Sequence, residues 1–186
     1  TVPLVLSTAN TNALSVAEYV ITSAMMLLRG SYAATAEVAA GKWPRNALSN
    51  GRETAGKTLG IIGFGSIGRR VAAMAQALGV NVIAFDAMLP AGDAAYASAG
   101  VQYSPLDRLI SNADVVTLHV PLVDGTRGLF NAARIATMKR GSVLINTSRG
   151  HIVDMSALVA ALRAGQLGGQ IQRLAHSHGH EHFAFG

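Results

Sequence analysis

The sequence contains no cysteine, which excludes disulfide bridges and thiolate chemistry. Only 13% of the residues are charged and 5% are aromatic, whereas half are hydrophobic. A chain of 186 residues with this composition can bury a sizeable core, so an intrinsically disordered body is excluded as well. The lack of cysteine fits a reducing compartment, and we expect a cytoplasmic protein.

Long hydrophobic runs are also lacking. No apolar run approaches the ~20 residues of a membrane-spanning helix, and no signal peptide is recognisable, so we expect no membrane partner. The net charge of +5 comes from Lys and Arg residues that are scattered along the chain and accompanied by few aromatics. We therefore expect no nucleic-acid partner, since an anionic small ligand explains the sign equally well.

Apolar segments alternate with helical segments from Lys57 onward. Strands are predicted at 58–62, 81–85, 101–103, 114–118 and 142–146, and helices at 66–78, 104–111, 131–138 and 154–164. The strands are apolar throughout rather than alternating, which indicates a sheet that is covered on both faces and hence parallel. The predicted fold class is therefore α/β, with a doubly wound parallel sheet.

The residues before Lys57 are predicted to form a strand near the start, a polar loop and then one long helix. Ser15 and Glu18 have the spacing of a capping box, so the helix is expected to start at Ser15 and to end near Gly41. The expected domains are 1–14, the end of a substrate domain with a crossover loop; 15–169, the doubly wound domain with its leading helix; and 170–186, a His-rich tail.

The stretch "TLGIIGFGSIGRR" places Gly63, Gly65 and Gly68 in the G-x-G-x-x-G spacing between a strand and a helix. In a dinucleotide site the three glycines make the tight turn, let backbone approach a pyrophosphate and permit close helix–strand packing. The backbone N–H groups of Ser66 and Ile67 would then face the phosphates. The alternative is a purely structural turn.

Asp86 ends the next predicted strand, 18 residues after Gly68. An acid near this offset accepts hydrogen bonds from the adenine ribose, and its charge repels a 2′-phosphate. No arginine follows Asp86, so the sequence favours NAD over NADP. The alternative is an aspartate that caps a helix.

Further polar groups are expected where strands leave the carboxyl edge of the sheet, which is where open α/β sheets bind ligands. The stretch "TLHVPLVDGTRGLF" puts His119, Pro121 and Thr126 there, and we predict that all three lie at the cofactor site. A lone histidine in such a place usually packs or bonds to backbone. We therefore do not predict that His119 carries the proton of a reaction.

The stretch "SVLINTSRGHIV" is an apolar run that ends in Thr147, Ser148 and Arg149. These residues are predicted at the same edge, with Thr147 and Ser148 near the cofactor. The guanidinium of Arg149 can hold a carboxylate through two charged hydrogen bonds of ~1.5–3 kcal/mol each, which makes it the candidate catalytic residue. The alternative is a solvated arginine with a capping role for the helix at Asp154.

Four segments, in order along the chain, resemble the D-isomer-specific 2-hydroxyacid dehydrogenases of the phosphoglycerate and glycerate/hydroxypyruvate dehydrogenase kind. They are "SVAEYV", "GRETAGKTLGIIGFGSIGRRVA", "SNADVVTLHVPLVDGTRGLFNAARIATMKRGSVLINTSRGHIVD" and "ALVAALRAGQLGG". The resemblance implies a Rossmann domain that binds NAD, a separate substrate domain that is missing here, and a homodimer of the intact protein. It also implies that Arg149 anchors a small 2-hydroxy or 2-keto acid and that Thr147–Arg149 border the nicotinamide.

The chain departs from the family after Gly169, where "QIQRLAHSHGHEHFAFG" resembles no family segment. We therefore expect the following strand to be lost, which leaves an unpaired sheet edge. No Glu–His pair can be assigned for proton transfer. His176, His178, His180 and His182 alternate and could bind zinc, but a shifted reading frame also explains this tail, and we predict no metal site.

The predicted function is that of an NAD-dependent oxidoreductase that acts on the CH–OH group of a D-2-hydroxy acid. The chain is expected to be its cofactor-binding portion and, alone, a poor catalyst. The alternative is a non-catalytic, corepressor-like module that senses NAD(H) by dimerising.

Overall fold

The protein is built around one seven-stranded sheet, seen in a computed structural model that describes residues 12–30, 34–49, 52–175 and 181–185. The strand order is β3-β2-β1-β4-β5-β6-β7, in which only the last pair is antiparallel. The strands are β1 Thr58–Ile62, β2 Asn81–Phe85, β3 Gln102–Tyr103, β4 Val115–Leu118, β5 Ser142–Asn146, β6 Leu167–Ala175 and β7 Glu181–Phe185. The predicted fold class is confirmed, because the chain order reverses between β1 and β4 as in a doubly wound Rossmann sheet.

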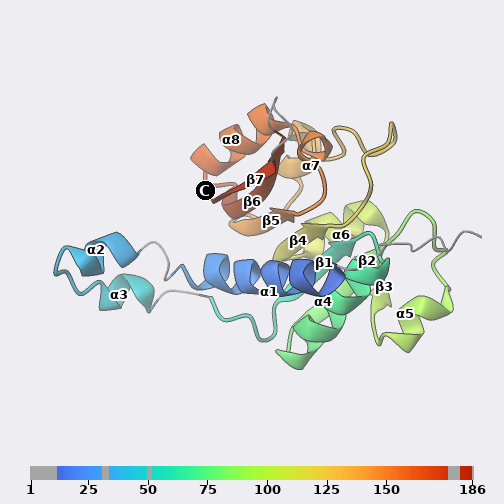
Figure 1. The fold of residues 1–186 in the computed structure, drawn as a ribbon, viewed down its shortest axis with the longest axis horizontal. Coiled ribbons are helices and arrows are strands. Elements are labelled where there is room, and N and C mark those ends of the chain that lie inside the picture. Colours follow the sequence, from blue (N-terminus) through green and yellow to red (C-terminus); the bar gives the residue numbers. More distant parts are fainter. Residues whose placement is uncertain (1–11, 31–33, 50–51, 176–180, 186) are drawn as a thin grey trace, which may run out of the picture.

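Helices cover both faces of the sheet (Figure 1). One face carries α1 Ala13–Arg29 and α4 Ser66–Ala77, and the other carries α6 Leu106–Asn112, α7 Ala132–Ala136 and α8 Met155–Arg163. The remaining short elements are α2 Thr35–Ala39, α3 Arg45–Leu48, α5 Ala94–Ser98 and the 3₁₀ turn η2 Gly150–Ile152.

Two hydrophobic cores lie on either side of the sheet, and β5 contributes to both. Val143 and Ile145 pack on the side of α1 and α4, whereas Leu144 packs on the side of α7 and α8. All three side chains are essentially fully buried, which is worth about 1.5–3 kcal/mol for each of them. Coverage of both faces is the reason that the strand sequences are apolar throughout.

The single long helix predicted from Ser15 to near Gly41 is wrong. The helix α1 starts at Ala13 after the N-cap residue Asn12, so Ser15 and Glu18 lie inside it and form no capping box. It ends at Arg29 because Gly30 takes a left-handed conformation with φ 65° and donates its N–H to the Met26 carbonyl.

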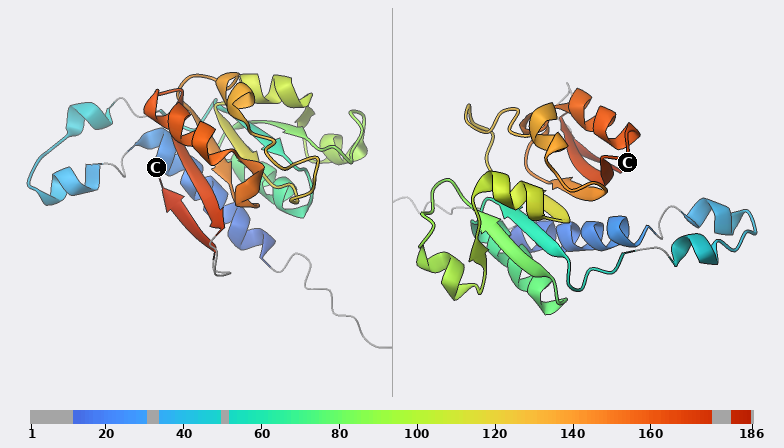
Figure 2. Two further views of the ribbon diagram at one scale, coloured as in Figure 1. Left: turned by 90° about the horizontal axis from the view of Figure 1, so that it is seen from above. Right: turned by 180° about the vertical axis from the view of Figure 1, so that it is seen from behind.

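After this break, α2 and α3 form an arm that projects from the body of the domain (Figures 1 and 2). The two helices have five and four residues, and α2 contains no buried residue among those described. The arm also carries Trp43, which is 81% exposed.

The unpaired sheet edge expected after Gly169 is also wrong. The strand β6 runs to Ala175 and pairs in parallel with β5, and Ile171 is buried in the core on the α1 side. This strand was not predicted because β6 contains polar residues and is not apolar throughout. The strand predicted near residue 2 and the histidines at 176, 178 and 180 lie outside the described residues.

We predict that Gly30→Ala destabilises the protein by about 1–2 kcal/mol, because alanine pays that cost in the left-handed conformation. Urea denaturation of the variant and the parent protein measures the difference. A continuous helix through residue 30 predicts the opposite sign, a gain of up to about 1 kcal/mol, since alanine is the better helix former.

Candidate functional site

Four parallel strands end level with one another at the carboxyl edge of the sheet. Phe85, Ile62, Leu118 and Asn146 are register partners in neighbouring strands, so they form one row across β2, β1, β4 and β5. The residues that directly follow this row are Asp86, Gly63, His119 and Thr147. Neighbouring strands lie ~4.8 Å apart, so residues as far apart in sequence as Gly63 and Thr147, which are 84 positions apart, are brought together here.

The three glycines of the turn between β1 and α4 have different environments. A Cβ atom on Gly63, which has φ 96°, would lie 2.6 Å from the carbonyl oxygen of His119. One on Gly68 would collide with the carbonyl oxygen of Gly63. A Cβ atom on Gly65 would meet no described atom within 4 Å. Packing therefore requires glycine at 63 and 68, whereas Gly65 faces open space at the start of α4.

Ser66 and Ile67 form the first turn of α4, as predicted. Among the described residues no side chain caps this helix, whose N-cap is Gly65. The N-terminal end of a 12-residue helix carries partial positive charge from its oriented peptide groups. The turn therefore has the shape and the sign of charge that suit a phosphate group.

Asp86 is half-buried and holds the glycine turn from the end of β2. Its Oδ2 accepts a hydrogen bond of 2.7 Å from the Phe64 N–H, and its Oδ1 accepts one of 2.8 Å from the Met88 N–H. Met88 lies in a turn, so the capping of a helix by Asp86 is not observed. A carboxylate oxygen can accept a second hydrogen bond, so Asp86 retains capacity for hydroxyl groups of a ligand.

Tyr96, which was not predicted from the sequence, contacts both Asp86 and the glycine turn. Its hydroxyl accepts a hydrogen bond of 3.1 Å from the Asp86 N–H, and its ring stacks on Phe64 with 5.1 Å between centroids. Burial raises the pKa of the Tyr96 phenol, which keeps it protonated. The short helix α5 that carries Tyr96 was not predicted either, although Asp93 caps it by accepting from the Ala95 N–H and could have indicated its start.

His119 stands at the end of β4, between two threonine hydroxyls. Its Nε2 lies 3.1 Å from the Thr117 Oγ1, and its Nδ1 lies 3.5 Å from the Thr147 Oγ1. Burial lowers the pKa of His119 to about 4, so the imidazole is neutral near pH 7. Whether His119 takes part in proton transfer stays a prediction.

Asn146 shapes the segment that follows β5, and sequence reasoning missed it as well. It is fully buried, its Nδ2 donates to the Arg149 carbonyl at 2.9 Å, and its Oδ1 accepts from the Ser148 N–H at 3.0 Å. The Ser148 hydroxyl donates to the Leu118 carbonyl at 2.9 Å, which ties the segment to β4. The sequence signal for this role was an asparagine at the end of an apolar run, since asparagine side chains often bond to nearby backbone in turns.

Arg149 is exposed at this edge. Its Nη1 donates to the Ser148 carbonyl at 3.0 Å, and within the described part of the chain no carboxylate pairs with it. The helix α8 is capped by Asp154, whose Oδ1 accepts from the Ala157 N–H, so Arg149 has no capping role there. Its guanidinium therefore offers donors to an anionic ligand.

Pro121 and Thr126 lie in the loop that follows β4. The Thr126 hydroxyl donates to the Pro121 carbonyl at 2.6 Å and accepts from the Val123 N–H at 2.9 Å. These bonds give the hydroxyl a role in the shape of the loop, and a contact of either residue with a cofactor stays a prediction.

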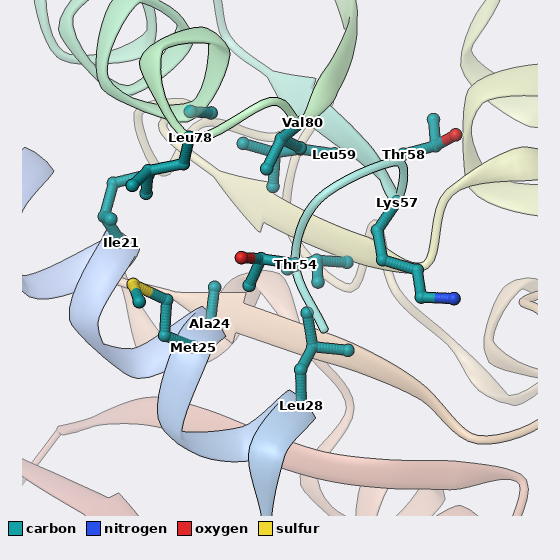
Figure 3. A pocket seen from close by; sticks show the side chains of 12 residues that line it. Ile21, Ala24, Met25, Leu28, Thr54, Lys57, Thr58, Leu59, Leu78 and Val80 are labelled. Atoms are coloured by element: carbon teal, nitrogen blue, oxygen red, sulfur yellow. The ribbon is translucent and has the colours of Figure 1, made fainter. Parts of the chain in front are cut away.

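An apolar cavity lies at the opposite edge of the sheet (Figure 3). Its lining includes Ile21, Met25 and Leu28 of α1, together with Leu59 near the start of β1. It is therefore separate from the carboxyl edge. In the described ranges no three potential metal ligands cluster, and no described helix is long and apolar enough to cross a membrane.

Comparisons with known proteins agree on the kind of domain. A family model described as D-isomer specific 2-hydroxyacid dehydrogenase, NAD binding domain, matches residues 21–171. A (S)-sulfolactate dehydrogenase from Chromohalobacter salexigens is 52% identical over 165 residues, which cover 89% of this chain and 53% of that protein. A D-3-phosphoglycerate dehydrogenase from Haemophilus influenzae is 43% identical over 160 residues, which cover 85% and 37%.

Among solved structures, the NAD-dependent formate dehydrogenase from Staphylococcus aureus in complex with NAD matches with a TM-score of 0.79 at 33% identity. That match covers 86% of this chain and 48% of the other. The chain thus spans about half, or less, of the length of the proteins it matches.

We predict that stability falls as the pH is lowered from about 6.5 toward 4, because His119 takes up its proton more readily in the unfolded chain than in the native one. The stabilisation is fully present above the pKa that His119 has in the unfolded chain. It is lost as the pH falls toward the pKa that His119 has in the folded protein. After discounting for partial exposure we expect a loss of about 1–2 kcal/mol from this residue.

The comparison of denaturant unfolding at pH 7 and pH 4.5 between the parent protein and His119→Gln isolates this contribution. If the unfolding free energies of both proteins depend equally on pH, His119 does not make this contribution.

Proposed function

The chain belongs to the family of the D-isomer specific 2-hydroxyacid dehydrogenase NAD-binding domain, and on this premise we propose that its carboxyl edge binds NAD(H) for an oxidoreductase. The intact protein would interconvert a D-2-hydroxy acid and its 2-keto acid, and the lack of cysteine supports a reducing compartment such as the cytoplasm. The observation that carries the proposal is the row of four level strand ends, which gathers the glycine turn, Asp86 and the Arg149 segment at one edge.

The adenosine diphosphate half of the cofactor would lie over β1 and β2. Gly65 leaves room for the pyrophosphate, and the backbone N–H groups of Ser66 and Ile67 are candidates to face it at the start of α4. Asp86 is placed to accept hydrogen bonds from the adenine ribose hydroxyls. Its negative charge disfavours a phosphate at that position, which supports NAD over NADP.

The nicotinamide half would lie over β4 and β5, beside Thr147 and Ser148, with Pro121 and Thr126 in the adjoining loop. NAD supplies the hydride acceptor when it is bound. The exposed guanidinium of Arg149 would hold the carboxylate of the substrate through parallel charged hydrogen bonds and so fix its orientation. The fixed shape of Thr147–Arg149 supports this role, because Asn146 orders it from within the protein.

The substrate we propose is a small 2-hydroxy or 2-keto acid. By their names, the two dehydrogenase relatives act on three-carbon 2-hydroxy acids that carry a sulfonate or a phosphate as a second anionic group. Residues 1–14 would be the end of a substrate domain and its crossover loop, and 15–169 the NAD-binding domain. The atypical tail would be 170–186, whose described residues continue β6 and form β7 in the same sheet. No described residue can be assigned as proton donor, so we propose that this chain alone is a poor catalyst.

The rival proposal is a non-catalytic module that senses NAD(H) by dimerising. The two proposals differ in what happens after NADH binds. We would titrate the chain with NADH by calorimetry and then assay oxidation of bound NADH by 2-keto acids, including 3-sulfopyruvate and 3-phosphohydroxypyruvate. Turnover, even when slow, favours the dehydrogenase, whereas binding with dimerisation and no turnover favours the sensor. Failure to bind NADH overturns both.

We also propose that the chain forms a homodimer through α1. Leu14 and Met25 are exposed hydrophobic side chains on this helix, and Met25 borders the apolar cavity (Figure 3). Leu78 at the end of α4 lines the same cavity and is also exposed. A second copy that covers this face would bury all three side chains.

Replacing Asp86 with asparagine removes the charge but keeps the size of the side chain. We predict that the ratio of NADH to NADPH affinity falls at least about tenfold, or ~1.4 kcal/mol, because the repulsion of the 2′-phosphate is lost. Calorimetry with both cofactors measures this ratio. Damage to the glycine turn weakens both cofactors equally, so an unchanged ratio would refute the role of Asp86 in cofactor choice.

The variant Met25→Glu should shift the protein from dimer to monomer in sedimentation experiments, because a charge cannot be buried in an apolar interface without a large cost. Met155→Glu is the matched control, since Met25 and Met155 are 39% and 40% exposed on different helices. If both variants keep the dimer, or if the parent protein is monomeric, the α1 interface is wrong.

A further inference from the structure

His119 contacts both halves of the candidate site. Its backbone supports the glycine turn, because its carbonyl occupies the space that a Cβ atom on Gly63 would need, and its N–H donates to the Ile62 carbonyl at 2.7 Å. Its side chain points the other way, toward β5, where the Nδ1 lies 3.5 Å from the Thr147 hydroxyl. One residue thus lies between the turn after β1 and the segment after β5.

The imidazole is anchored more closely to Thr117 than to Thr147. The Thr117 side chain is fully buried, and its hydroxyl lies 3.1 Å from the Nε2 of His119. A neutral imidazole has one N–H donor and one acceptor nitrogen, so the two threonine hydroxyls must take opposite roles. The bond to Thr117 therefore fixes whether the Thr147 hydroxyl donates or accepts.

Thr147 is 7% exposed, and it is the first residue of the segment proposed to border the nicotinamide. Asn146 fixes the backbone of that segment through its bonds to the Arg149 carbonyl and the Ser148 N–H. In the described part of the chain, the Nδ1 of His119 lies at the limit of hydrogen-bond distance from the Thr147 hydroxyl, at 3.5 Å. The orientation of the Thr147 side chain thus depends on His119.

We propose that His119 is a positioning residue, which orients the Thr147 side chain under the nicotinamide while its backbone carbonyl braces the glycine turn. This inference rests on the proposed NAD site and assigns His119 a role through Thr147 rather than through direct contact with the cofactor. Loss of the imidazole removes the side-chain link and leaves the backbone contact with Gly63 in place. The nicotinamide half of the cofactor should therefore lose affinity while the ADP-ribose half keeps it.

The experiment compares NADH with ADP-ribose, which has the same adenine, pyrophosphate and second ribose but no nicotinamide. Calorimetry on the full chain gives both dissociation constants. For His119→Leu we expect NADH binding to weaken about tenfold and ADP-ribose binding to change less than twofold. His119→Gln restores a donor and an acceptor and should bring NADH to within about threefold of the parent protein.

Thr147→Val is the partner variant, because valine has the shape of threonine without the hydroxyl. His119→Leu and Thr147→Val combined should cost no more NADH affinity than either alone, since both break the same contact. Multiplicative losses in the double variant overturn the proposal, and so does an equal loss of NADH and ADP-ribose in His119→Leu, which indicates general damage. A parent protein that binds neither ligand instead refutes the proposed NAD site itself.

Discussion

The level ending of four parallel strands is the constraint on which the rest of the site depends. Parallel hydrogen-bond register aligns Phe85, Ile62, Leu118 and Asn146 in one row, and the chain must turn immediately afterwards in all four strands. The residues that follow are therefore held within a few strand spacings of one another, although the sequence separates them widely. The hydrophobic cores on both faces keep this row in place, because each strand is buried on two sides.

Side-chain hydrogen bonds to backbone fix the conformation of the loops that follow the aligned strand ends. Asp86 fixes the glycine turn through the Phe64 N–H, and Asn146 fixes the Arg149 segment through two hydrogen bonds to backbone. These two side chains hold the loops in place, as backbone hydrogen bonds hold the strands. Gly65 and the guanidinium of Arg149 remain exposed to ligands. The family model of the D-isomer specific 2-hydroxyacid dehydrogenase NAD-binding domain matches residues 21–171, a range that includes both loops.

Sequence patterns predicted the parts of the structure that local chemistry determines. The strands at 58–62, 81–85 and 142–146 were predicted to the residue, because apolar runs bounded by turns need no distant information. The break at Gly30 was missed because apolar spacing continues past it, although a glycine at this point is itself a signal for a helix end. The roles of Tyr96 and Asn146, and the pairing of β6, depend on neighbours far away in sequence, which periodicity cannot show.

The central claim, that this edge binds the pyrophosphate of NAD, is tested most directly by Gly65→Ala, measured for unfolding free energy and for NADH affinity. Nothing described lies within 4 Å of the added Cβ atom, so we predict a stability within about 0.5 kcal/mol of the parent protein and an NADH affinity at least about tenfold lower. Gly68→Ala should instead lose about 2–3 kcal/mol of stability through collision with the Gly63 carbonyl. Unchanged NADH affinity in stable Gly65→Ala would contradict the account.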